Sequence, residues 1–291
     1  MKVKIFDSSF LFTGAKATTL HLSPERFNDE PEHFTWDKQD GSNMEFNENI
    51  WISDACLMSH TMDIKTTGKK IAWLIESMSL RPNHYEFVRE NHDLFDYILT
   101  SNYMFRSALR EAHGYNNALW IPAASSFVKK DRWGIIPKTK LASMIVSDKL
   151  MTPMHIFRAD VALFAEQNGV DVFGTGRGKY ISHYDAISDY MFHIVVEGCN
   201  EMGVFSEKVI DCFALGTVPI YKGCENSLNM FFDGRGIINF NKVKDLEDIL
   251  TTLNTERYIN MVNAIEINNK DAKNLYTAED WIYRKYPMLF E

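Results

Sequence analysis

Cysteine is scarce in this sequence and never closely paired. The four cysteines stand at positions 56, 199, 212 and 224 and form no Cys-x-x-Cys pair. This spacing argues against a zinc site and a dithiol redox motif. We expect reduced thiols, mostly buried, in a cytoplasmic protein, and no disulfide framework.

Basic runs and long apolar runs are also missing. No run of lysine and arginine exceeds two residues, and the net charge is -8, so the clustered cations that a nucleic-acid backbone requires are absent. No stretch approaches the roughly 18 apolar residues that a membrane-spanning helix needs. The N-terminal MKVKIFDSSFLF is typical of a first strand and not of a signal peptide. We therefore expect no nucleic-acid partner and no transmembrane segment.

Familiar metal-binding motifs are absent as well. The chain has no Asp-x-Asp triplet, and its nine histidines show no His-Glu-x-x-His spacing. The acidic cluster at 245–248 lies in an amphipathic helical pattern, which is typical of a solvated helix face. We therefore expect neither a metal nor another cofactor.

What the chain does contain is an alternation of strand-like and helix-like segments. With 291 residues, 45% of them hydrophobic, it is long enough for two domains of ordinary size. Strands are predicted at 2–6, 49–57, 69–76, 94–101, 118–123, 141–148, 171–174, 192–197, 218–223 and 236–240, with a helix near 153–168. This alternation favours α/β domains built on open parallel sheets.

The polar stretch at 125–140, which contains Gly and Pro, predicts the domain boundary. We place an N-terminal domain at 1–135 and a C-terminal domain at 136–291. The segment 23–49, rich in acidic and turn-forming residues, is predicted to be a long loop. The last stretch begins with a capping-box pattern of Thr277 and Asp280. It predicts a helix that packs back on the N-terminal domain.

The most informative region is the run FHIVVEGCNEMGVFSEKVIDCFALGTVPIYKG at 192–223. Two apolar strands flank a helix whose N-cap would be Ser206. Lys208 then falls in the first turn, where the backbone already carries about half a positive charge. A diphosphate would offset this cation, and the neighbouring Glu207 could accept the hydroxyls of a ribose. The alternative is that Glu207 and Lys208 are two solvated residues at a helix end.

The same run resembles the donor-binding signature of the family 10 glycosyltransferases, the α-1,3/4-fucosyltransferases. In that family an aromatic-rich strand ends in Glu and is followed by a Thr/Ser-Glu-Lys helix and a Gly-x-x-Pro-x-x-x-Gly strand. A weaker likeness extends through 138–149 and 71–77. The resemblance implies an α/β protein of GT-B architecture, with two Rossmann-like domains and a cleft between them. It also implies a metal-independent, inverting transfer, first of all of fucose from GDP-fucose, to a hydroxyl of a glycan acceptor.

The resemblance assigns roles to individual residues. Arg158 lies where the family has the arginine that clamps the diphosphate, and a guanidinium suits phosphate bidentately. A surface arginine on a helix is the alternative. Glu76 ends an apolar strand at the place of the family's general base, although Met78 replaces the family's Pro. Glu76 could instead cap the next helix.

Two positions that line the donor pocket in the family differ here. Gly198 stands where many relatives have Asn, and Val204 stands where many have Tyr. The donor sugar therefore stays open. Further candidates at the donor site are Glu197 and Lys222, and Arg177 and Lys179 in the glycine-rich turn GTGRG. A transferase of another nucleotide sugar and a non-catalytic glycan- or nucleotide-binding module of the same fold are the alternative functions.

Overall fold

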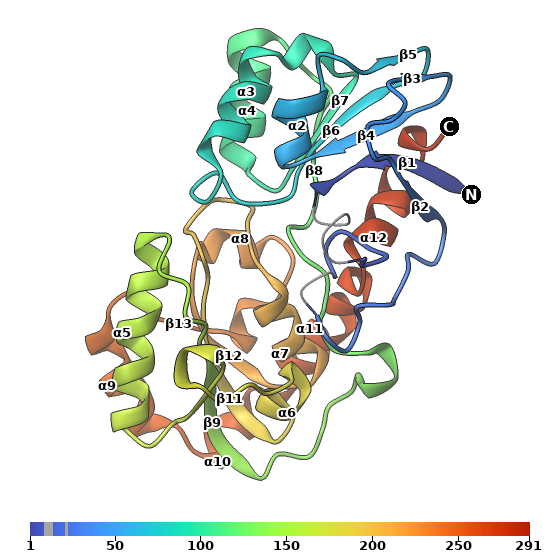
Figure 1. Ribbon diagram of the computed structural model, residues 1–291. Helices are drawn as coiled ribbons and strands as arrows, with labels where there is room; N and C mark the ends of the chain where they lie inside the picture. The colour runs from blue at the N-terminus through green and yellow to red at the C-terminus, as the bar shows by residue number, and fades with distance from the viewer. Residues whose placement is uncertain (9–13, 21–22) are drawn as a thin grey trace. The chain divides into compact units, whose positions relative to one another are not determined.

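The computed structural model describes residues 1–8, 14–20 and 23–291. They form two compact units (Figure 1). The first unit comprises Met1–Ser125, Glu201–Val204 and Thr277–Glu291, and the second comprises Ser126–Asn200 and Phe205–Tyr276. The expected first strand ends at Phe6, and positions 9–12 of that N-terminal segment lie outside the described residues.

The sheet of the first unit has six strands in the order β2-β1-β4-β6-β7-β8, all parallel. The chain goes from β1 to one neighbour, β2, and later to the neighbour on the other side, β4, so the strand order reverses between β1 and β4. A separate parallel pair joins β3 and β5. The bounds are β1 Lys2–Phe6, β2 Thr35–Lys38, β3 Glu45–Phe46, β4 Ile50–Ser53, β5 Lys65–Thr66, β6 Lys70–Leu74, β7 Tyr97–Thr100 and β8 Ala118–Trp120.

Successive residues of these strands face opposite sides of the sheet. On one face, Ile50 and Ile52 share an apolar cluster with residues of helices α2 (Ala55–His60), α3 (Pro82–Glu90) and α4 (Tyr103–His113). On the other face, Trp51 and Trp73 pack with Ile282 of α12 (Ala278–Lys285). The C-terminal helix, red in Figure 1, thus completes the core of the first unit.

The sheet of the second unit has five strands in the order β10-β9-β11-β12-β13, again all parallel. Here the order reverses between β9 and β11. The strands are β9 Lys140–Ile145, β10 Asp171–Phe173, β11 Tyr190–Val196, β12 Val218–Lys222 and β13 Ile238–Asn239.

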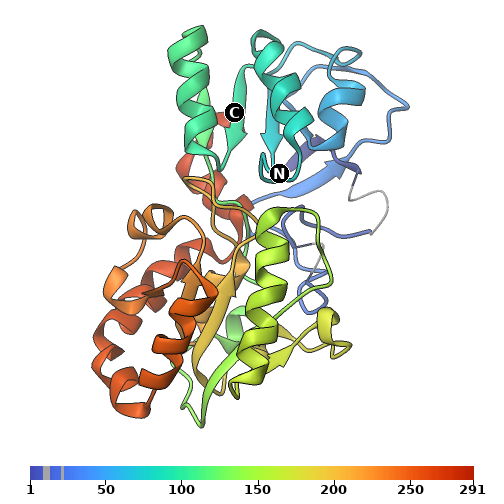
Figure 2. The same ribbon diagram turned by 90° about the vertical axis from the view of Figure 1, so that its left-hand side faces the viewer.

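Helices cover both faces of the second sheet, as Figure 2 shows from the side of α5. Residues of α5, α9, α10 and α11 share one apolar cluster with the strands. Helix α11 also packs on α7, and α6 and α7 contact the strands too. The helices are α5 Pro153–Gln167, α6 His183–Ile187, α7 Glu207–Ala214, α8 Glu225–Asn229, α9 Val243–Thr252, α10 Thr255–Asn260 and α11 Val262–Ala272. The predicted class, two Rossmann-like α/β halves with parallel sheets, is confirmed.

The largest differences from the predicted elements lie in residues 23–57. The strand predicted at 49–57 ends at Ser53, because Asp54 adopts a φ of 40° and turns the chain into α2. The loop predicted at 23–49 contains β2 and β3. Edge strand β2 pairs with β1, but its sequence TWDK is mostly polar. It therefore lacks the alternation of apolar and polar residues by which a strand is predicted.

The capping box predicted at the last helix does not form. The side chain of Thr277 makes no capping hydrogen bond, although the residue does occupy the N-cap position of α12. Asp280 instead accepts the backbone N–H of Glu32 at 2.8 Å and pairs with the ring of His33. Contacts within the first unit replace the local cap.

Among residues 1–8, 14–20 and 23–291, no helix combines the length and the apolar character needed to cross a membrane. None of the four cysteines is in a disulfide, and Cys56, Cys199 and Cys212 are buried, as predicted.

Candidate functional site

The carboxyl edge of the second sheet collects several of the predicted donor-binding residues. Glu197 and Gly198 directly follow β11, and Ser147 comes shortly after β9. Lys208 lies in the first turn of α7, and Arg158 lies in the second turn of α5. Since the strand order reverses between β9 and β11, this edge is where open α/β sheets bind ligands.

Arg158 is buried, so the alternative of a surface arginine is wrong. It is only 4% exposed, and its Nη2 donates a hydrogen bond of 2.8 Å to Ser147 Oγ. Its Nε has no hydrogen-bond partner among the described residues. Burial lowers the pKa of Arg158, while the carboxylates of Glu207 and Glu197 act in the opposite direction. A buried N–H without a partner is costly, and a phosphate oxygen would satisfy it.

Glu207 and Lys208 open α7 as predicted, with Ser206 at the N-cap position. The Nζ of Lys208 lies 2.5 Å from Glu207 Oε1, and the two side chains are 22% and 15% exposed. They form a partly buried ion pair, so the alternative of two solvated residues is wrong. Burial opposes ionisation of Glu207, but the charges of Lys208 and His183, together with hydrogen bonds from Lys208 and the backbone, outweigh burial, and the pKa of Glu207 is lowered. Glu207 thus supplies an anion for the lysine in the first helical turn.

Glu197 ties the end of β11 to the start of α7. Its side chain is 3% exposed, and its Oε1 accepts the backbone N–H of Ser206 at 3.0 Å. Burial raises the pKa of Glu197, against the opposing effect of Lys208. The carboxylate therefore positions the helix end that precedes Glu207 and Lys208.

The secondary candidates are engaged elsewhere in the second unit. Lys222 donates to Asn241 at 3.0 Å, and Arg177 forms an ion pair with Glu166 at 3.1 Å. Lys179 is exposed and ends the glycine-rich turn. None of these contacts brings the three cations together with Arg158.

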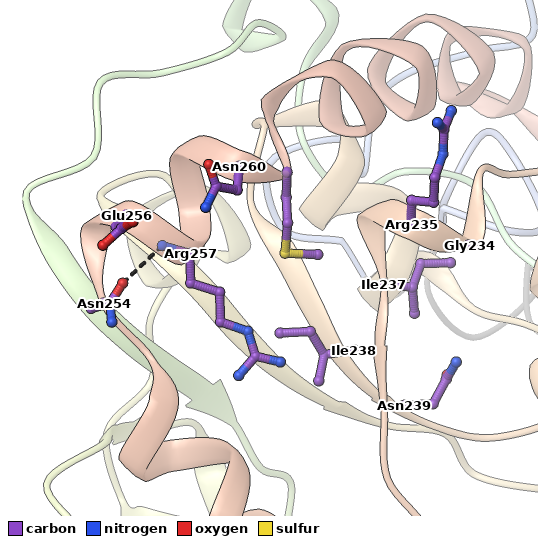
Figure 3. Close-up of a pocket in the computed structure, with 10 residues that line it drawn as sticks. Gly234, Arg235, Ile237, Ile238, Asn239, Asn254, Glu256, Arg257 and Asn260 are labelled. Atoms are coloured by element: carbon purple, nitrogen blue, oxygen red, sulfur yellow. Dashed lines mark hydrogen bonds between the residues drawn. The ribbon is translucent and has the colours of Figure 1, made fainter.

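A cavity of about 590 Å³ lies beside β13 and α10 in the same unit (Figure 3). Its two arginines are held by neighbours, since Arg235 pairs with Asp233 and the guanidinium of Arg257 donates to Thr252. Asn254 accepts the backbone N–H of Arg257 and so caps α10. The cavity is lined by neither Arg158 nor Lys208.

In the first unit, three acidic residues follow three adjacent parallel strands. Asp7 comes directly after β1, Asp54 directly after β4, and Glu76 closely after β6. Asp54 escaped notice in the sequence because it falls inside the strand predicted at 49–57. Its place at the end of an apolar run, like that of Glu76, was the available signal.

The Glu76 carboxylate makes no hydrogen bond or ion pair with any described residue, and Arg81, not Glu76, occupies the N-cap of α3. The alternative of a helix-capping role is therefore wrong. The backbone of Glu76 is held at both ends, since its N–H donates to Asp54 Oδ1 at 3.4 Å and its carbonyl accepts from Tyr85 at 2.9 Å. None of the described residues engages the carboxylate, which leaves it available to act on a ligand.

Asp54 has a strained backbone and a perturbed carboxyl group. It is the single non-glycine residue of the described chain with a positive φ, a conformation that clusters at functional sites. Burial, followed by the charges of Glu76 and Asp7, raises the pKa of Asp54 to about 7. The neighbouring charges of Glu76 and Asp7 therefore favour the protonated form of the Asp54 carboxyl.

Replacing Asp54 by Asn should change stability only at the higher pH values. Asp54 has an unfolded pKa of about 3.9 and a folded pKa of about 7. The folded state therefore keeps a proton that the unfolded state loses between these values, and the free energy of unfolding falls as pH rises through that window. The free energy of unfolding of Asp54→Asn should equal that of the parent near pH 4 and exceed it near pH 8, by at most a few kcal/mol. Urea unfolding at both pH values measures this, and an identical difference at both would contradict the raised pKa.

The predicted site residues divide between the two units. Glu76 and Val204 belong to the first unit, and the second unit holds Arg158, Glu197, Gly198, Glu207 and Lys208. Val204 is 9% exposed, and Gly198 has its carbonyl bonded to Thr152 Oγ1 at 2.8 Å. Within residues 1–8, 14–20 and 23–291, no three His, Cys, Asp or Glu side chains group as metal ligands.

No protein-family model and no curated protein matches the chain. Solved structures do. An α1,3-fucosyltransferase solved with GDP has a TM-score of 0.58 and 16% identity, over 99% of this chain and 89% of that one. An α1,3-fucosyltransferase solved with GDP-fucose has a TM-score of 0.57 and 15% identity, over 100% of this chain and 89% of that one.

Anabaena HepE, solved with UDP and glucose, gives a TM-score of 0.55 and 12% identity, over 83% of this chain and 77% of that one. The chain has the GT-B fold. At these identities the likeness is one of fold, so the chemistry has to be argued from the side chains described above.

Proposed function

We propose that the protein is a glycosyltransferase that moves a sugar from a nucleoside diphosphate to a hydroxyl of a glycan, with GDP-fucose as the first candidate donor. The observation that supports this most is Arg158, a buried guanidinium at the strand-order reversal of a GT-B sheet, whose Nε has no hydrogen-bond partner among the described residues. A nucleoside diphosphate is the ligand class that this arrangement suits best.

On the donor side, Arg158 and Lys208 stabilise the leaving group. When the bond between the anomeric carbon and the diphosphate breaks, negative charge grows on the phosphate oxygens. Fixed cations and the N–H groups at the start of α7 stabilise that charge without reorganising. Glu207, held by Lys208, accepts hydrogen bonds from the ribose hydroxyls.

On the acceptor side, Glu76 is the general base. Its carboxylate takes the proton of the acceptor hydroxyl, the oxygen attacks the anomeric carbon, and the diphosphate leaves with the bonding electrons. A single displacement of this kind inverts the anomeric configuration. Metal is not needed in this scheme, because side-chain cations oppose the charge of the leaving group.

A transferase of a different nucleotide sugar is the second candidate. Gly198 and Val204 support it, because both depart from the residues that line the donor pocket in the fucosyltransferases that this sequence resembles. The likeness to HepE, solved with UDP and glucose, points the same way. A non-catalytic nucleotide- or glycan-binding module is the third, and the free Glu76 carboxylate counts against it.

Nucleotide binding without added metal is the direct test. GDP at a hundred times its Kd should stabilise the protein by about 2.7 kcal/mol, and the shift in melting temperature should persist in EDTA. UDP and CMP serve as comparisons. Turnover lost on chelation, or a larger shift with UDP, would reject the metal-independent fucosyl assignment.

A further inference from the structure

His155 is a second buried side chain of α5 with an unsatisfied polar atom. It precedes Arg158 by three residues, a spacing that places both on one face of the helix. The side chain is 6% exposed, and Nδ1 has no hydrogen-bond partner in the described part of the chain. Leaving such an atom buried and unpaired costs free energy, and a bound ligand would relieve that cost.

The other ring nitrogen lies against Gly198. A Cβ added to Gly198 would stand 3.2 Å from His155 Nε2, closer than side chains normally approach. Thr152, the N-cap of α5, donates to the Gly198 carbonyl at 2.8 Å and so joins the two segments. The glycine therefore leaves room for the imidazole immediately after the end of β11.

The surroundings of His155 keep its ring neutral. Burial, followed by the charges of Arg158, Lys149 and Lys208, lowers the pKa of His155 to about 4. A neutral imidazole donates through one nitrogen and accepts through the other, whereas the nearby cations only donate. Phosphate oxygens only accept, so they suit the cations. A hydroxyl both donates and accepts, so it suits the imidazole.

We propose that His155 binds a hydroxyl of the transferred sugar next to Gly198, while Arg158 binds the diphosphate. This inference rests on the proposed function, because it requires a nucleotide sugar at the carboxyl edge of the second sheet. His155 is then a residue that determines donor specificity, and it distinguishes the nucleotide sugar from the free nucleotide.

His155→Leu and His155→Asn test the proposal in the full-length protein. Calorimetry with GDP and GDP-fucose, or with UDP and UDP-glucose if the parent prefers that pair, gives four affinities to compare with the parent's two. We expect His155→Leu to lower the affinity for the nucleotide sugar by about tenfold and to leave the affinity for the free nucleotide unchanged. Asn places an amide near Nδ1 and should restore most of the affinity. Unchanged binding of the free nucleotide also shows that the variant is folded.

If His155→Leu lowers the affinity for the free nucleotide as much as that for the nucleotide sugar, the proposed sugar contact is rejected. It is also rejected if neither affinity falls. If the parent binds no nucleotide at all, the proposed function itself fails. If the parent binds and only His155 proves insensitive, the proposed function stands and the sugar contact fails.

Gly198→Ala provides an independent check from the other side of the contact. Its new Cβ should displace the imidazole by a few tenths of an ångström and lower the affinity for the nucleotide sugar but not for the free nucleotide. Because both changes act on the same contact, the double variant with His155→Leu should lose no more than the worse single variant. Additive losses would show that Gly198 and His155 act separately and would contradict the proposal.

Discussion

Glu76→Gln should lower turnover by about a hundred- to ten-thousandfold. Glutamine has the size of glutamate and similar hydrogen-bonding atoms, but it cannot take the proton of the acceptor hydroxyl. The backbone contacts that hold this residue, to Asp54 and from Tyr85, do not involve its side chain. The substitution should therefore leave the loop in place and remove only the base.

Initial rates with a panel of acceptors measure the loss, and calorimetry measures nucleotide affinity in parallel. Affinity should stay at the parental value, because Glu76 belongs to the first unit and the proposed diphosphate contacts belong to the second. The matched control is Glu86→Gln on α3, whose side chain is 61% exposed and which should change neither quantity. Parental turnover in Glu76→Gln would show that another group is the base. Tight nucleotide binding by a parent that transfers to no acceptor would favour the binding module.

Segments whose hydrophobic pattern is local were predictable from the sequence. The run at 192–223 gave β11, α7 and β12 close to their observed bounds, because each is a short apolar element ended by Gly or a polar loop. Edge strand β2 was not predictable, since its alternation is hidden by Thr35, Asp37 and Lys38. Its pairing depends on β1, and nothing in its own sequence reveals that partner.

The candidate site divides in the same way. Glu197, Glu207 and Lys208 stand in one contiguous motif. A lysine in the first turn of a helix suggested an anionic ligand, and the family resemblance of the whole motif added weight to that interpretation. Asp54 and His155 acquire their character only from burial and from neighbours distant in sequence, such as Glu76 and Gly198. A carboxyl group with a raised pKa and an imidazole kept neutral are tertiary properties, and one isolated sequence does not encode them in a readable pattern.

Arg158→Ala and Lys208→Ala should each lower nucleotide affinity by about ten- to a hundredfold. Each removes a charge-assisted contact to the diphosphate worth roughly 1.5–3 kcal/mol. The structure adds a distinction between them. Arg158→Ala removes the hydrogen bond to Ser147 and also the Nε that has no partner among the described residues. The variant therefore loses a donor that is available to a ligand. Loss of Lys208 also leaves Glu207 without its ion-pair partner, and a bare carboxylate there would repel phosphate further.

A second substitution at each position separates these effects. Arg158→Lys keeps the charge but loses the planar fork, so it should recover only part of the affinity. In a Lys208→Ala, Glu207→Gln double variant the repelling carboxylate is gone, and affinity should exceed that of Lys208→Ala alone. Lys244→Ala, at an exposed position of α9, is the control for a general loss of positive charge. Calorimetry with GDP measures all of these variants. Parental affinity in Arg158→Ala would mean that the buried guanidinium serves the fold and does not hold a diphosphate.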